Sequence, residues 1–153
     1  MPTPITYSDQ DADAATRTLS GEARGETPVG EDAVPWVLRN RLSFAPSWWG
    51  RTIFDICHKK WQFSCWNGGA DTDHITGLKQ GDTEYATLLT MVKGVFEGAI
   101  PDPTGGSTMY KVRGTPASWD KATAGHPPRS IGHHDFWRMT PGGAVLPFTD
   151  EEV

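Results

Sequence analysis

The feature of the sequence that most constrains its fold is a 3.6-residue apolar period over residues 82–96. Apolar side chains at this spacing are typical of a helix that packs one face on a core. They are Tyr85, Leu88, Leu89, Val92 and Phe96. Asp82 stands just before them and is a residue type that caps helices. We therefore expect a core-facing helix here, with Asp82 as its N-cap.

Two other long segments also show helical spacing. The first starts at Ser8 or Asp9 and runs to about Leu19, behind acidic residues that suit a helix N-terminus. The second covers residues 28–42, where Pro35 conflicts with an unbroken helix and predicts a kink or a late start. One face of this second segment holds Gly30, Ala33, Val34, Val37, Leu38 and Arg41. Residues 52–58 can add one or two further helical turns.

The remaining segments are shorter and more interrupted. A turn is expected at residues 67–69, which read Asn-Gly-Gly, and a Pro/Gly-rich loop at residues 100–108. Residues 109–112 and 131–139 are strand candidates, and the last residues are expected to fray. The length of 153 residues fits one domain, so we expect a single catalytic domain over residues 1–153 with its core at about 9–139. The predicted fold class is α+β, mainly helical with a small β element.

Charge and hydropathy exclude several classes of protein. The chain has 14 basic and 19 acidic residues, a net charge of −5, and no basic run that could follow a phosphate backbone, so we expect no nucleic-acid partner. No apolar stretch approaches the roughly 20 residues of a membrane helix, and we expect no stable membrane association. The N-terminus lacks the charged and apolar regions of a signal peptide. Two cysteines, Cys57 and Cys65, permit one local bridge but no disulfide framework.

The strongest chemical signal is the segment from Ser20 to Glu26, which reads Ser-Gly-Glu-Ala-Arg-Gly-Glu. If the helix continues through it, Glu22 and Glu26 share one face within about 5–6 Å. Carboxylates so placed can perform acid/base work on a glycosidic bond, because one that is held protonated in an apolar cleft can donate to the leaving oxygen. The alternative is a solvent-exposed helix end, since acidic residues at helical spacing are common on exposed faces.

A second signal is the aromatic content outside the helical stripes. The chain has seven Trp, six Phe and three Tyr, and large rings in loops often line clefts that bind the apolar faces of sugars. Core packing is the default for any single ring. The run from Trp61 to Trp66 is the strongest case, because its rings alternate with the polar residues Gln62 and Ser64. We interpret this run as a stacking surface for a polysaccharide.

Four motifs in order resemble the SleB/CwlJ-type cell wall hydrolases, which include spore-cortex lytic enzymes and phage or prophage lysins. The first covers residues 19–26 with Gly30, residues 33–37 and residues 39–41 behind it. The others are Gln62-Phe63-Ser64-Cys65-Trp66, the segment 105–110, and the closing motif of Ile131, Gly132, His134 and Phe136. The resemblance covers about residues 16–138. The sequence departs from the family pattern at Met109, where a His is usual, and at Pro35, where an Ala is usual.

This resemblance implies a lysozyme-like fold related to goose-type lysozymes and lytic transglycosylases. It also implies that Glu22 is the general acid/base, that Glu26 assists or orients, and that peptidoglycan is the substrate. The expected substrate-binding residues are Gln62, Phe63, Ser64, Trp66 and Tyr110. We predict neither a metal site nor a cofactor.

Other chemistries stay open as alternatives. A zinc amidase would need histidine ligands, but none of the five histidines forms a His-Glu-x-x-His pattern, and we expect His134 to be a hydrogen-bonding core residue. A Cys-His peptidase would need Cys57 or Cys65 as nucleophile, for which no local signature exists. A non-enzymatic glycan-binding phage protein would use the aromatic residues alone.

The expected reaction is lytic transglycosylation of the MurNAc–GlcNAc bond. Glycosidases that hydrolyse usually hold a second carboxylate about 5–9.5 Å from the acid. Beyond Glu26 the candidates are Asp71 and Asp73, which we place in a loop, and a hydrolytic N-acetylmuramidase is the alternative. We also expect a monomeric endolysin stored in the host cytoplasm until a holin releases it, or else a virion-borne lysin.

Overall fold

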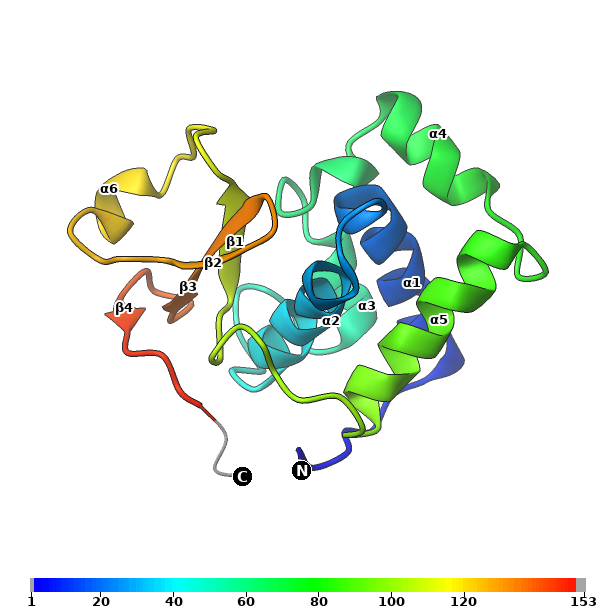
Figure 1. Cartoon of the computed structure of the whole chain (residues 1–153), viewed down its shortest axis with the longest axis horizontal. Helices are drawn as coiled ribbons and strands as arrows, with labels where there is room; N and C mark the ends of the chain where they lie inside the picture. Colours follow the sequence, from blue (N-terminus) through cyan, green and yellow to red (C-terminus); the bar gives the residue numbers. More distant parts are fainter. Residues whose placement is uncertain (1, 151–153) are drawn as a thin grey trace.

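The structure, a computed structural model, describes residues 2–150, which form a helical body with a small β part beside it (Figure 1). The helices are α1 (Asp9–Ala23), α2 (Pro28–Leu42), α3 (Ile53–His58), the 3₁₀ turn η1 (Ser64–Trp66), α4 (Gly69–Gly77), α5 (Thr83–Phe96) and α6 (Asp120–Thr123). The strands are β1 (Met109–Val112), β2 (Arg129–Ile131), β3 (His134–Met139) and β4 (Val145–Leu146).

Helix α1 is the centre of the helical body, where α2, α3, α4 and α5 all pack against it. Ser8 caps it through a capping box with Asp11, which satisfies exposed N–H groups at its start. The helix runs to Ala23, four residues beyond the end expected from the sequence. It extends because Ser20 and Ala23 are buried and continue the packed face.

Helices α2 and α5 lie where the sequence predicted them. Helix α2 begins at Pro28, with Thr27 as its cap, and continues through Pro35 without a break, so the expected late start is wrong. Pro35 removes only one helical hydrogen bond, and the buried faces on both sides keep the helix in place. Asp82 stands at the N-cap of α5, but its carboxylate accepts from the N–H of Lys79 instead of capping the helix.

Several short elements were not predicted, among them α4, α6 and β4. Helix α4 occupies the segment after the Asn-Gly-Gly turn, so the expectation that Asp71 and Asp73 lie in a loop is wrong. Its only buried residue is Ile75, and a helix with so little apolar surface has no period to detect. Helix α6 and strand β4 span four and two residues, which is too short for a periodic signal.

The β part is an antiparallel sheet in the order β1-β3-β2, with β4 paired to the far end of β3. The single strand expected over residues 131–139 is wrong, because the chain turns back at Gly132 and His133 and forms the hairpin β2–β3. Phe136 of β3 is fully buried against Ala33 and Val37 of α2. This contact joins the sheet to the helical body, and Tyr110 of β1 reaches the last turn of α1, where its hydroxyl donates to Glu22.

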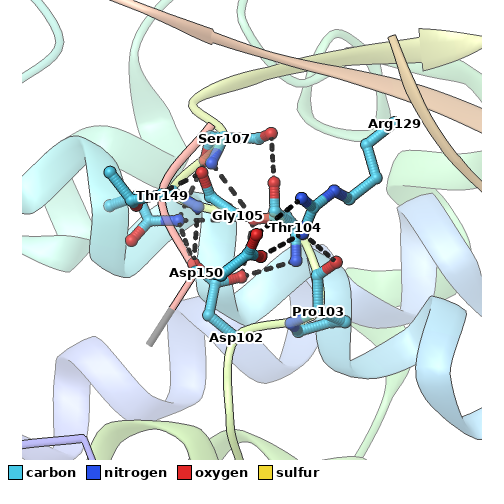
Figure 2. A network of polar contacts seen from close by, with 10 residues as sticks. Asp102, Pro103, Thr104, Gly105, Ser107, Arg129, Thr149 and Asp150 are labelled. Carbon is cyan, nitrogen blue, oxygen red and sulfur yellow. Dashed lines mark hydrogen bonds and ion pairs between the residues drawn. The ribbon is translucent and has the colours of Figure 1, made fainter. Parts of the chain in front are cut away.

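A polar network fixes the loop that leads into β1 (Figure 2). Asp102 accepts hydrogen bonds from the N–H groups of Thr104 and Gly106 and from the side chain of Asn40 on α2. Thr149, in the part expected to fray, donates its N–H to Gly105 at 2.8 Å. Residues 151–153 lie outside the described residues. The loop before β1 is therefore held from the helical side and from the end of the described chain.

Within residues 2–150, no helix is both long enough and apolar enough to cross a membrane.

Candidate functional site

Glu22 lies in the last turn of α1, at a cavity of about 120 Å³ between the helical body and the β part. The other walls come from α2, the segment 61–63, β1 and residues 118–119. Residues far apart in the sequence therefore converge on one carboxyl group. This carboxyl group lies at the junction between the helical body and the small sheet.

Gly21, directly before Glu22, allows α1 to reach this position. A Cβ at residue 21 would lie 2.4 Å from the Cβ of Cys65 and 2.8 Å from its Sγ, closer than atoms can approach. Only glycine therefore permits the contact between α1 and the segment that carries Gln62 and Phe63. The glycine before the glutamate has a packing role that brings the walls of the cavity together.

The environment of Glu22 favours its protonated form. Burial raises its pKa from 4.5 to about 7, and the charge of Asp71 on α4 acts in the same direction. The hydroxyl of Tyr110 donates a hydrogen bond to Oε1 at 3.2 Å, and this bond and the charge of Arg41 oppose the rise. Near neutral pH, Glu22 can therefore both release and accept a proton, which is the property of a general acid/base.

Arg41 of α2 is a buried cation behind this site. Its Nε donates to the carbonyl of Thr108 at 2.7 Å, and its Nη1 to Oε1 of Gln62 at 3.1 Å. Its Nη2 contacts Sδ of Met109, the residue that departs from the family pattern, at 3.3 Å. Burial lowers the pKa of Arg41 to about 10. Arg41 was not among the expected site residues, although its charge on the apolar face of residues 28–42 was a signal for such a role.

Glu26 lies in a different environment from Glu22. Helix α1 ends at Ala23, so the expectation that both glutamates share a helical face is wrong. The Glu26 carboxylate is 3.0 Å from Nδ1 of His133 and 3.5 Å from Nδ1 of His134. It also lies so close to Gly132 that a Cβ there would be 2.6 Å from Oε2. The hairpin turn between β2 and β3 thus encloses Glu26.

A second cavity, of about 330 Å³, connects the two glutamates. Its walls include Glu22, Glu26, His133, His134 and Val112. Glu22 borders both cavities, whereas Glu26 borders only this second one. His134 is buried as expected, but Nδ1 of its ring makes no hydrogen bond within the described residues, contrary to the hydrogen-bonding role expected. Burial lowers its pKa, which favours the neutral ring beside Glu26.

The expected substrate-binding residues do not all lie at this site. Gln62, Phe63 and Tyr110 line the Glu22 cavity, whereas Ser64 and Trp66 do not. The ring of Trp66 packs against His58, and its Nε1 donates to Thr18 at 2.9 Å. The 3₁₀ turn η1 causes the divergence, because it points successive side chains in different directions.

The run from Trp61 to Trp66 is therefore not one continuous stacking surface. Phe63 is only 2% exposed and packs in the core beneath the Arg41 guanidinium, which lies 5.0 Å from its ring centroid. Trp61, by contrast, projects into solvent. A strict alternation of exposed rings and polar groups would have required an extended strand, which this segment does not form.

Two alternative chemistries can be compared with the structure. Among residues 2–150, no three His, Cys, Asp or Glu side chains lie close enough together to hold a metal ion. Cys57 and Cys65 are free and buried. Burial raises the pKa of Cys57 to about 12 and also raises that of Cys65, so neither thiol forms the thiolate that nucleophilic attack requires.

A larger cavity lies elsewhere, at the outer end of the β part between the segment 126–129, β3 and the segment 145–148. It measures about 620 Å³ and is mainly apolar, with Trp137 and Phe148 in its walls. Its lining includes two arginines and a histidine but no carboxylate. It therefore offers no group for acid catalysis near neutral pH comparable with Glu22.

Comparisons with known proteins agree with this geometry. The catalytic domain of Bacillus cereus SleB is 26% identical, over 88% of this chain and 94% of that chain, with a TM-score of 0.63. The catalytic domain of the germination-specific lytic transglycosylase SleB from Bacillus anthracis is 25% identical, over 88% of this chain and 98% of that chain, also with a TM-score of 0.63. No curated protein sequence gives a significant match.

These matches confirm the predicted fold class, which is α+β, mainly helical and lysozyme-like. The sequence model of the cell wall hydrolase family matches residues 25–137, well over half of the chain. The family resemblance seen in the four sequence motifs is thereby confirmed. The chain belongs to the cell wall hydrolase family and is an enzyme that acts on the cell wall.

Proposed function

We propose that this enzyme is a peptidoglycan lytic transglycosylase that cleaves the MurNAc–GlcNAc bond with Glu22 as its general acid/base. The observation that carries the proposal is the raised pKa of Glu22, about 7, at a cavity between the helical body and the sheet. The family assignment and the similarity to a lytic transglycosylase from Bacillus anthracis support it.

The proposed reaction uses one carboxyl group twice. Protonated Glu22 donates its proton to the glycosidic oxygen, and the bond from that oxygen to C1 of N-acetylmuramic acid breaks. The resulting Glu22 carboxylate then accepts the proton of the C6 hydroxyl of the same sugar, whose oxygen bonds to C1. The product carries a 1,6-anhydro ring, no water is consumed, and Glu22 ends protonated as it began. A pKa near 7 suits both steps.

The position of the other carboxylates favours this route over hydrolysis. Glu26 is enclosed by the β2–β3 turn and contacts two histidines, so it does not lie in the Glu22 cavity. Asp71 affects the pKa of Glu22 from α4 but lines neither of the two cavities. Glu22 is the only acidic residue of the described chain that lines the cavity shared with Tyr110 and Gln62. Transglycosylation needs no second carboxylate.

One observation favours hydrolysis as a second candidate. The Glu26 carboxylate and His133, 3.0 Å apart, border the cavity that also contains Glu22. Such a pair can orient or deprotonate a water molecule for attack on C1, as in an N-acetylmuramidase. The products differ by one water between the two reactions.

The test is the digestion of purified peptidoglycan in water enriched in ¹⁸O, followed by mass spectrometry of the released muropeptides. We expect 1,6-anhydro ends without label. Reducing muramic ends that contain ¹⁸O would show hydrolysis and direct attention to Glu26. Release of free stem peptides with intact glycan strands would instead show an amidase. Loss of this peptide release in the presence of a chelator would identify a zinc amidase.

The expected substrate contacts stay proposals. Gln62, Phe63 and Tyr110 line the Glu22 cavity and are the best placed, while Ser64 and Trp66 would have to act from outside it. The endolysin role, storage in the host cytoplasm, release by a holin or delivery in a virion, and the monomeric state also stay predictions. Lysis of cells by the added protein, and its mass in solution, would test them.

A further inference from the structure

Trp61 combines three properties that no other described residue combines. It has a φ of +68°, it is 71% exposed, and it lines the Glu22 cavity. Among residues 2–150 it is the only residue other than glycine with a positive φ. A bulky side chain is strained in this left-handed region, whereas glycine adopts it freely.

Packing does not explain a tryptophan at this position. The ring is mostly in solvent, and its described partner is Lys60, whose Nζ lies 5.3 Å from the ring centroid. A large exposed apolar ring in a strained backbone conformation lowers stability without adding to the core. Strained residues of this kind are found at ligand-binding and catalytic sites, where the side chain is needed in one place.

The size of the Glu22 cavity indicates where a sugar would bind. Its volume of about 120 Å³ is below the roughly 300–1,000 Å³ of cavities that enclose a ligand. A sugar ring must therefore bind at the mouth of the cavity and present only its reacting bond to Glu22. Trp61, which borders the cavity and projects into solvent, is an aromatic ring available at that mouth.

A second tryptophan borders the same cavity from the β part. Trp119 precedes α6 and packs edge to face against Trp137, with ring centroids 5.4 Å apart. Trp137 is itself fixed by a hydrogen bond from Nε1 to the carbonyl of His126 at 2.8 Å. Trp119 is thus positioned by packing against Trp137 of the sheet. The position of Trp61 is set instead by its backbone conformation.

We propose that Trp61 and Trp119 form an outer sugar-binding subsite at the mouth of the Glu22 cavity, and that the strained conformation of Trp61 is retained for this contact. The ligand is a pyranose ring of a glycan strand, whose apolar C–H face stacks on an aromatic ring. This inference rests on the proposed function, because the subsite would position a glycan for cleavage at Glu22.

The matched control is Trp48. It is also an exposed tryptophan, at 57%, with a lysine over its ring, since Nζ of Lys59 lies 4.6 Å from the centroid. Its φ is not positive, and it lines neither cavity that borders Glu22. A general effect of removing a surface tryptophan would appear at both positions, whereas loss of the subsite would appear only at Trp61.

The experiment measures binding separately from cleavage. Soluble glycan strands are titrated into the Glu22→Gln protein with and without Trp61→Gly, Trp61→Phe or Trp48→Gly. We expect Trp61→Gly to raise the Kd about tenfold, Trp61→Phe to change it by less than about threefold, and Trp48→Gly to leave it unchanged. In melting experiments, Trp61→Gly should raise the Tm by roughly 2–4 °C, because it relieves the strain.

The outcomes separate this inference from the proposed function. If the protein with Glu22 intact cleaves glycan strands but Trp61→Gly leaves the Kd unchanged, the subsite is overturned and the proposed function stands. If no cleavage occurs but Trp61→Gly still weakens glycan binding, the subsite stands and the reaction is wrong. A Tm that falls in Trp61→Gly would show that the ring stabilises the fold, and absence of any glycan binding would overturn both proposals.

Discussion

Glu22 and Glu26 are four residues apart in one motif, yet the structure places them in two different environments. Glu22 is on the last turn of α1, and its carboxyl group accepts one hydrogen bond, from Tyr110. Glu26 lies beyond the end of the helix and is enclosed by a hairpin turn with two histidines. The end of α1 at Ala23 separates the two. Residue type and spacing therefore do not decide the environment of a carboxyl group, and burial at the end of α1 is the main cause of the raised pKa of Glu22.

The largest expected effect is the loss of activity in Glu22→Gln. The amide keeps the shape of the side chain but cannot donate a proton, so we expect the rate of peptidoglycan cleavage to fall by about 10²–10⁴-fold or more. Turbidity loss of purified peptidoglycan measures it, with circular dichroism as the control for folding. Full activity in a variant of confirmed mass would remove Glu22 from the mechanism.

The same substitution should stabilise the protein at alkaline pH. The folded-state pKa of Glu22, about 7, exceeds the value of 4.5 for an unperturbed side chain, so its ionisation opposes folding as the pH rises from 4.5 to 7. The free energy of unfolding of Glu22→Gln should therefore exceed that of the unsubstituted protein by about 3 kcal/mol at and above pH 7. This gain should vanish below pH 4.5. Urea unfolding of both proteins at pH 4.5 and pH 8 should therefore show a gap that opens only at pH 8. An equal gap at both values would contradict the raised pKa.

Tyr110→Phe should move the pH profile of activity. Above a pH of about 7 the rate should fall about tenfold per unit in the unsubstituted enzyme, because the acid form of Glu22 is lost. The hydrogen bond from Tyr110 lowers the pKa of Glu22, so its removal should shift this decline to higher pH. Rates at six or more pH values across 5.5–9 measure the shift, and a decline that moves to lower pH would refute this role of Tyr110.

The smallest effect is expected at Glu26. If Glu26 only orients the β2–β3 turn, Glu26→Gln should lower the rate by less than about tenfold and leave the alkaline decline where it is. His133→Ala, which removes the exposed partner at 3.0 Å, should have a similar or smaller effect. Should Glu26→Gln instead abolish activity as fully as Glu22→Gln, the two carboxyl groups would share the chemistry and hydrolysis would become the better description.

The sequence indicated the helical part of the fold better than the β part. Helices α2 and α5 carry wide apolar faces, so their periods located them within a residue or two. Helix α4 has a single buried residue and no detectable period. The break between β2 and β3 depends on Gly132, where a backbone turn and the enclosed Glu26 carboxylate leave no space for a side chain. That contact joins residues more than 100 positions apart, and no local pattern reveals it.

At the candidate site, the residue types could be identified from the sequence, but the directions in which their side chains point could not. Glu22 was found through a motif that is local in the chain. Arg41 was missed as a site residue, because a single charge on an apolar face shows its role only when its three partners are known. Trp66 was grouped with Phe63 by spacing, yet a 3₁₀ turn separates their side chains. Directions of side chains in short irregular segments depend on backbone angles that composition does not determine.

The two free cysteines have a consequence for where such an enzyme can work. Both thiols are buried in the main core cluster, and burial raises the pKa of each, so they stay protonated. A protonated, buried thiol reacts slowly with oxidants and with other disulfides. The covalent structure of the folded chain is therefore insensitive to redox potential, and the same fold can persist in a reducing compartment and in an oxidising one without a chaperone for disulfides or a reductant.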